Sequence, residues 1–151
     1  MAVPIPIAMT QIDFYVVKDA RRGDRFDFTC RLVERVRKDR LRVLINCPDQ
    51  RQARHLDRLL WTYREESFLP HGLVGETDPV LTPVLISADG QPDSEDQVLI
   101  NLDTRPEVPP FFSRFQRLCE LLDQDAAALE AGRTRFAYYR DCGYPLRHHQ
   151  V

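Results

Sequence analysis

The sequence predicts a single α/β domain whose mostly parallel sheet is flanked by helices. Strand-like and helix-like segments alternate over the first 63 residues, which is the βαβα order of a parallel sheet. The 151 residues are close to the usual size of one domain. No repeat or linker divides them. We therefore expect one domain over 12–147, preceded by an N-terminal extension at 1–11 and followed by a short tail at 148–151.

The first half of the chain predicts two strands and two helices. Residues 12–17 (IDFYVV) and 41–47 (LRVLINC) are rich in β-branched and other apolar side chains, which favour buried strands. Residues 27–40 place apolar side chains at every third or fourth position, so they predict an amphipathic helix with Asp27 as its N-cap. Residues 50–63 repeat this spacing and predict the second helix.

The next part of the chain predicts two more strands and one ambiguous segment. Residues 83–87 (PVLIS) and 97–102 (QVLINL) have the composition of core strands. The polar residues 88–96 predict an exposed loop, and 64–82 is expected to be mostly loop. Residues 111–122 fit neither period: their leucine content favours a helix, and their alternation does not decide the matter.

The last part of the chain predicts a helix and a short strand. Residues 124–141 form the helix, with Asp123 and Asp125 near its start, where carboxylates interact favourably with the helix dipole. Gly143 follows directly and is suited to end the helix. Residues 144–151 (YPLRHHQV) are expected to form a short strand and then the tail.

The charge distribution argues against a dedicated DNA-binding domain, because the net charge is −2. Residues 21–64 nevertheless hold 13 basic and 6 acidic side chains, and 133–151 hold four arginines and one aspartate. Such regions suggest acidic partners or a weak nucleic-acid contact, although solvated helix faces give the same pattern. Direct binding of single-stranded DNA also needs aromatic platforms, and only Phe26 and Phe28 are candidates in the early stretch.

The cysteines and the apolar segments indicate the cellular compartment. The four cysteines, Cys30, Cys47, Cys119 and Cys142, include no C-x-x-C pair, and the first residues lack the pattern of a secretory signal. No run of eighteen apolar residues is present, so no membrane span is expected. We therefore expect a cytoplasmic protein with free thiols, three of them in the core.

The sequence motifs of nucleotide and metal chemistry are missing. The segment after the first strand, KDARRGDR, contains one glycine, and neither G-x-G-x-x-G nor G-x-x-x-x-G-K-[ST] occurs. His148 and His149 are adjacent, and His55 and His71 have no cysteine or histidine at a zinc spacing. We therefore expect no cofactor and no metal. A small α/β nucleotide-using enzyme with an unrecognised site is the alternative hypothesis.

Two segments have the composition of binding surfaces. Residues 56–71 end a helix and enter a loop with Trp61 and Phe68, and aromatic side chains often anchor interfaces. Burial in the core would explain the same two residues. The second segment places arginines beside aromatic and small residues on one helix face: Arg133, Phe136, Ala137 and Arg140. Such a face can hold a carboxylate, or it can simply be solvated.

Taken in order, these segments resemble the chi subunit of bacterial DNA polymerase III. The most specific pieces are LDRLLW with SFLPH, then LINL, then RTRFAYYRDCGYPL, and the match runs from about residue 12 to residue 149. The resemblance implies a mononucleotide-binding (Rossmann-like) fold that binds no nucleotide, which agrees with the missing glycine motifs. It also implies that FQRLCELLD is a strand.

The resemblance further implies a non-catalytic adaptor at the replication fork. One surface would bind the psi subunit, which joins chi to the clamp loader. Another would bind the acidic C-terminal tail of single-stranded DNA-binding protein. Some family members use the psi-binding surface for a helicase linked to DNA repair. Contact with nucleic acid would be indirect, and the protein would act at the replisome.

Matching positions in the family assign residues to both surfaces. The psi surface would use these residues, the last two shaping the loop: Trp61, Phe68, Pro70 and His71. The tail site would use these: Arg133, Phe136, Arg140 and Leu122. Two positions that are often basic in related chains carry Ala137 and Leu129 here. The missing cations are expected to weaken tail binding and its dependence on salt.

Overall fold

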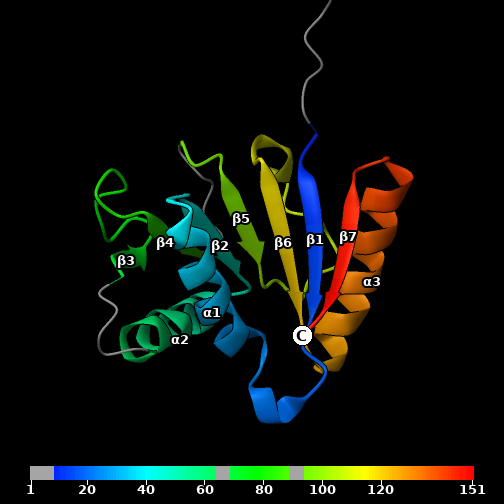
Figure 1. The fold of residues 1–151 in the computed structure, drawn as a ribbon, viewed down its shortest axis with the longest axis horizontal. Helices are drawn as coiled ribbons and strands as arrows, with labels where there is room; N and C mark the ends of the chain where they lie inside the picture. The colour runs from blue at the N-terminus through cyan, green and yellow to red at the C-terminus, as the bar shows by residue number, and fades with distance from the viewer. Residues whose placement is uncertain (1–8, 64–68, 89–93) are drawn as a thin grey trace, which may run out of the picture.

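Seven parallel strands form a single sheet (Figure 1). The computed structural model describes residues 9–63, 69–88 and 94–151, and within them the strand order is β3-β4-β2-β5-β6-β1-β7. Every pair of neighbouring strands is parallel. The strands are β1 (Gln11–Val16), β2 (Val43–Cys47), β3 (His71–Leu73), β4 (Val84–Ala88), β5 (Val98–Asn101), β6 (Arg117–Leu122) and β7 (Leu146–Gln150). The predicted α/β fold with a parallel, Rossmann-like sheet is confirmed.

Helices cover both faces of the sheet. Helices α1 (Arg25–Lys38) and α2 (Gln50–Thr62) lie on one face, and α3 (Ala126–Asp141) lies on the other (Figure 1). Because side chains alternate along a strand, Ile45 of β2 packs in the core under α1 and α2, and its neighbour Leu44 packs in the core on the α3 side. This coverage explains why the central strands are apolar on both sides.

Helix α1 begins earlier than the sequence analysis predicted. Asp24 is its N-cap and accepts hydrogen bonds of 3.0 Å from the backbone N–H groups of Phe26 and Asp27. The Asp27 carboxylate accepts the N–H of Asp24 at 2.9 Å in return, which completes a capping box. The prediction of Asp27 as N-cap was therefore wrong. Asp24 and Asp27 both cap the first turn, and Asp24, three residues earlier, is the N-cap.

The end of α3 leads directly into the last strand. Asp125 caps the start of α3, as its position suggested, by accepting the N–H of Ala128 at 2.9 Å. At the other end Gly143 has a φ of 81°, and its N–H donates to the carbonyl of Arg140 at 3.0 Å. The N–H of Tyr144 donates to the carbonyl of Tyr139 at 3.1 Å, so the helix ends in a Schellman motif.

Two edge strands differ from the predictions. β3 lies inside 64–82, which was expected to be mostly loop. The strand was not predicted because three residues are too few to show an alternating pattern. β7 continues to Gln150 and pairs with β1, so residues 148–150 belong to the sheet and the predicted tail was wrong there. The short strand expected here is confirmed, and the mostly polar side chains of LRHHQ hide how far it extends.

The ambiguous segment 111–122 contains a short 3-10 helix, η2 (Phe112–Arg114), followed by β6. The strand that the resemblance implied is confirmed, and the helix that the leucine content favoured is wrong. Cys119 and Leu121 pack on the α1–α2 side of the sheet, whereas Leu118 and Leu122 pack on the α3 side. A strand that is buried on both faces needs apolar residues at consecutive positions, and this removes the alternation on which a prediction relies.

Three thiols are core residues, as the sequence predicted. Cys30, Cys47 and Cys119 are buried, and burial raises the pKa of each thiol to about 12. Cys142, in the turn after α3, is exposed. In the part of the chain that the structure describes, no helix combines the length and the apolar character needed to cross a membrane.

We expect only Cys142 to react rapidly with a chromogenic thiol reagent at about pH 8, because the three buried thiols are protonated there and shielded. Titration should give one equivalent for the native protein and four in denaturant, the number of free cysteines. Cys142→Ser is the control and should remove the fast equivalent. A second fast equivalent would contradict the burial of the other three thiols.

Candidate functional site

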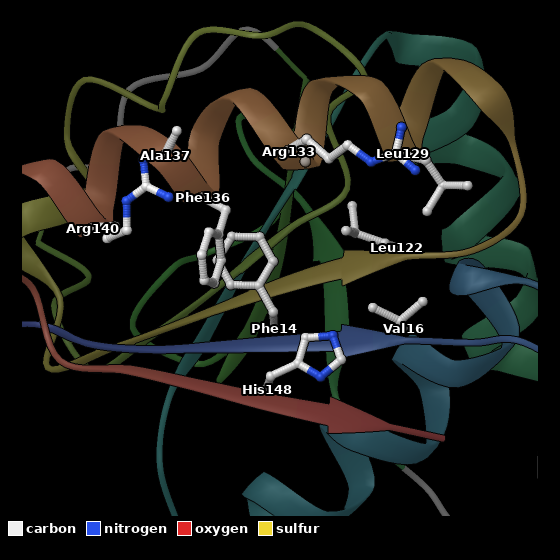
Figure 2. Close-up of a pocket in the computed structure, with 10 residues that line it drawn as sticks. Phe14, Val16, Leu122, Leu129, Arg133, Phe136, Ala137, Arg140 and His148 are labelled. Atoms are coloured by element: carbon white, nitrogen blue, oxygen red, sulfur yellow. The ribbon is translucent and has the colours of Figure 1, made fainter.

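A groove of about 440 Å³ lies between α3 and the strands β1, β6 and β7 (Figure 2). We call it the α3 groove, and it is lined by ten residues: Phe14, Val16, Leu122, Leu129, Gly132, Arg133, Phe136, Ala137, Arg140 and His148. The groove brings together the four residues assigned to the tail site, Leu122, Arg133, Phe136 and Arg140. Their role in binding remains a prediction.

The wall of the groove is one face of α3. Residues three, four and seven positions apart share a helix face, which is why Arg133, Phe136 and Arg140 line the same groove. The ring of Phe136 contacts Phe14 of β1 edge-on, with 5.2 Å between centroids. Arg133 is exposed and has no ion pair among the described residues. Arg140 is exposed and donates to the neighbouring Asp141 at 3.2 Å.

The groove therefore combines an apolar floor with cations at its rim. Phe14, Val16 and Leu122 form the floor, and the two arginines stand above it on α3 (Figure 2). A guanidinium binds a carboxylate through two parallel hydrogen bonds, and an apolar floor accepts an apolar side chain. This arrangement is suited to a peptide with an acidic and an apolar part, and above all to one that ends in a free carboxylate.

Gly132 determines how closely α3 approaches β6. A Cβ atom at this position would lie 2.5 and 2.6 Å from the two terminal methyl groups of Leu122. The absent side chain thus allows the helix to pack onto the floor of the groove.

We expect Gly132→Ala to weaken peptide binding in the groove while the protein stays folded. The new methyl group must displace the end of the Leu122 side chain, which lines the groove and can rotate. We expect a loss of about 1 kcal/mol, or roughly fivefold, in affinity for an acidic peptide, measured by fluorescence anisotropy. Thr134→Ala, an exposed position on α3 outside the groove, is the control. Unchanged affinity in Gly132→Ala would show that Leu122 is not part of the binding surface.

A buried network of polar side chains holds α3 against the sheet. Arg135 and Glu120 are fully buried and form an ion pair from α3 to β6. The other oxygen of Glu120 accepts from Asn101 of β5 at 2.5 Å, and Asn101 accepts from Asn46 of β2 at 3.0 Å. Arg135 also donates to the backbone carbonyls of Asp103 (at 3.0 Å) and Arg105. Nothing in the sequence pattern predicts this buried polar network.

Burial raises the pKa of Glu120, although the adjacent Arg135 guanidinium and the Asn101 amide act in the opposite direction. Burial destabilises the charged carboxylate of Glu120, and its partners stabilise it. The folded protein therefore needs these partners in order to hold a carboxylate in its core. Because Arg135 immediately precedes Phe136, the ion pair fixes the rotation of the helix turn that lines the groove.

A second surface lies near the opposite edge of the sheet, where α2 meets β3. Trp61 is 52% exposed at the end of α2 and packs against the His71 ring, with 4.5 Å between centroids. His71 is buried, with Nδ1 2.8 Å from the carbonyl of Leu69 and Nε2 3.1 Å from the carbonyl of Asp57. Pro70 is exposed, and Phe68 lies outside the described residues. We call Trp61 and Pro70, with His71 beneath Trp61, the Trp61 surface.

Aspartates cover the edge of the sheet at which nucleotide-binding folds hold phosphate. Asp24 and Asp125 cap the N-termini of α1 and α3, and Asp123 between them accepts the N–H groups of Arg25 (2.9 Å) and Asp125 (3.0 Å). Burial raises the pKa of Asp123, but these hydrogen bonds and the adjacent Arg25 guanidinium together outweigh that effect and lower it, so the carboxylate stays charged. Carboxylates at helix N-termini repel a phosphate, which disfavours the nucleotide-using alternative.

Comparison with known proteins agrees with this architecture. Residues 9–147 match the family described as DNA polymerase III chi subunit, HolC. The chain is 36% identical to DNA polymerase III subunit chi of Pseudomonas aeruginosa, over 95% of this chain and 98% of that one. The chi subunit of Escherichia coli is 30% identical, over 91% of this chain and 96% of that one. That of Haemophilus influenzae is 29% identical, over 88% and 92%.

A solved structure shows the same fold at much lower sequence similarity. Domain 2 of the DEAD-box helicase Mss116p, bound to an RNA duplex, superposes with a TM-score of 0.60 at 9% identity. The match covers 93% of this chain and 64% of that one, and at this identity it supports the fold alone. The family match and the three relatives cover nearly the whole chain, and so this protein belongs to the DNA polymerase III chi subunit family.

Proposed function

We propose that this chain is a non-catalytic accessory subunit that links the clamp loader, through psi, to single-stranded DNA-binding protein during DNA replication. The observation that carries the proposal is the α3 groove, where exposed arginines stand over an apolar floor. The tail of single-stranded DNA-binding protein has the matching chemistry: a run of acids, an apolar residue and a free carboxylate. We assign the terminal carboxylate to Arg133 and the apolar side chain to the floor around Phe136.

The Trp61 surface is the proposed contact for psi. It lies near the β3 edge of the sheet, whereas the α3 groove lies near the β7 edge (Figure 1). The two partners can therefore bind at once without overlapping. The resemblance implies a repair-linked helicase as a further partner of this surface, which would compete with psi.

Titration of the protein into a labelled peptide tests the proposed function. The peptide carries a run of aspartates, one apolar residue and a free C-terminal carboxylate, and the control peptide lacks the apolar residue. We expect saturable binding with a Kd on the order of micromolar, which is about −8 kcal/mol, and loss of binding with the control peptide. Absence of saturable binding at low salt would refute the tail-binding function and leave the fold and family untouched.

For the second surface, we expect Trp61→Ala to weaken binding of purified psi by about 2 kcal/mol or more, because Trp61 is half exposed and tryptophan is enriched among the residues that dominate interface energies. Tail-peptide affinity should stay unchanged. Tyr138→Ala is the matched control, since Tyr138 is also half exposed but lies on α3. Calorimetric titration of psi measures the effect. Equal losses in both variants, or a loss of both partners in Trp61→Ala, would contradict two separate surfaces.

A further inference from the structure

His148 occupies a position in the α3 groove to which no role has been given. It lies in β7, and its ring extends toward the space between the strands and α3 (Figure 2). Its side chain is exposed and has no hydrogen bond or ion pair within the described residues. The next residue, His149, has the opposite arrangement: it stacks on Tyr15 at 4.6 Å, and its Nε2 lies 3.1 Å from the Asp13 carboxylate.

The sheet register places His148 opposite the middle of the cationic wall. His148 is paired with Phe14, and Phe14 contacts Phe136. Phe136 lies three residues after Arg133 and four before Arg140, so the two arginines lie one helical turn to either side, about 10 Å apart along the axis. His148 thus faces both arginines across the groove floor, with no acidic side chain among the lining residues.

We propose that His148 is a third cationic contact for an acidic peptide in the α3 groove, made only when its ring is protonated. This inference rests on the proposed function and adds to it a dependence of affinity on pH. An imidazole changes charge between about pH 5 and pH 8, whereas the aspartates of the peptide stay ionised above about pH 5. Binding therefore becomes tighter as the pH falls through the histidine range.

The charged groups that line the groove beside the ring are cations of the protein. Arg133 and Arg140 on α3 face His148, and the residues facing it from β1 and β6 are apolar. Asp141 lies outside the lining residues and is engaged by Arg140. The carboxylates of a bound acidic peptide favour a protonated imidazole, so we expect peptide binding to take up a proton. Arg147 and His149 alternate to the other face of the sheet and do not contribute.

The test is peptide affinity at about pH 5.5, 6.5 and 7.5 and constant ionic strength, measured by fluorescence anisotropy on the full chain. We expect the natural sequence to bind roughly three- to tenfold more tightly at the lowest pH than at the highest. His148→Gln should bind with nearly constant affinity, and His148→Arg should bind tightly at all three values. Calorimetry in buffers of different ionisation enthalpy should show proton uptake that His148→Gln abolishes.

His149→Gln is the matched control, because it removes an imidazole one residue away on the opposite face. It should keep the pH dependence, which separates His148 from the overall change in charge near the isoelectric point of about 6.1. Retention of the full dependence in His148→Gln, or its loss in His149→Gln, overturns the inference and leaves tail binding intact. Absence of peptide binding at every pH overturns the proposed function, and the inference with it. Thermal melts at each pH confirm that all variants are folded.

Discussion

Arg135→Met is expected to lower the free energy of unfolding by about 3–5 kcal/mol, measured by denaturant titration. The substitution leaves the Glu120 carboxylate in the core without its cation, and burial already raises the pKa of that carboxyl. It also leaves the carbonyls of Asp103 and Arg105 without their donors. Methionine fills much of the volume of the arginine side chain. The loss of stability therefore measures the removal of the charge and of the hydrogen bonds.

Three comparisons make this prediction specific to the buried ion pair. Arg133→Met, an exposed position on the same helix, should change stability by no more than about 0.5 kcal/mol. Adding Glu120→Gln to Arg135→Met should restore part of the loss. The loss should also shrink from about pH 7 to about pH 5, because removing the Arg135 guanidinium raises the pKa of Glu120 further, so the folded variant binds the proton more readily than the folded natural protein. A loss below about 1 kcal/mol for Arg135→Met would contradict the role of the pair.

Arg133→Ala is expected to weaken binding of the acidic tail peptide by about 2 kcal/mol, or roughly thirtyfold, and to leave stability nearly unchanged. Arg133 is exposed and unpaired among the described residues, so its removal disturbs no internal contact. The truncation removes the guanidinium that we assign to the terminal carboxylate.

Arg147→Ala controls for the loss of one positive charge near the groove. Arg147 is exposed in β7 but alternates to the opposite face of the sheet, so its removal should change affinity only slightly. The two variants should differ most clearly at low salt. Similar affinities for Arg133→Ala and Arg147→Ala would indicate a diffuse electrostatic attraction and no specific site for the carboxylate.

The segments with strong periodicity were predictable, and the edges of the sheet were not. The pattern of Phe28, Leu32, Val33 and Val36 predicts α1 because one face of that helix is buried and the other is solvated. β3 gave no such signal, and β7 was expected only as a short strand that ends in a tail, since an edge strand needs little apolar surface to pair with its neighbour. The extent of β6 became clear only from the family resemblance, because both of its faces are buried.

The candidate site was predictable in part, for a similar reason. Helical spacing alone places Arg133, Phe136 and Arg140 on one face, but the spacing of Arg135 gives no indication that it is buried. Its partner Glu120 lies on another element, and a pairing of this kind becomes visible only when the helix is packed on the sheet. His148 was missed because it was expected in a tail, and only the register of β7 with β1 brings its ring into the groove.

The Schellman turn after α3 has a consequence for how the groove meets its ligand. The α3 wall and strand β7, which carries His148, are consecutive elements, joined by residues 142–145, and the turn between them is closed by the hydrogen bonds of Gly143 and Tyr144. A connection this short fixes the spacing between α3 and β7 when the chain folds, before a ligand binds. The conformational entropy lost on association then comes almost entirely from the peptide, whose flexible acidic run must become ordered. Such a preformed receptor favours fast capture, because binding requires no rearrangement of the protein.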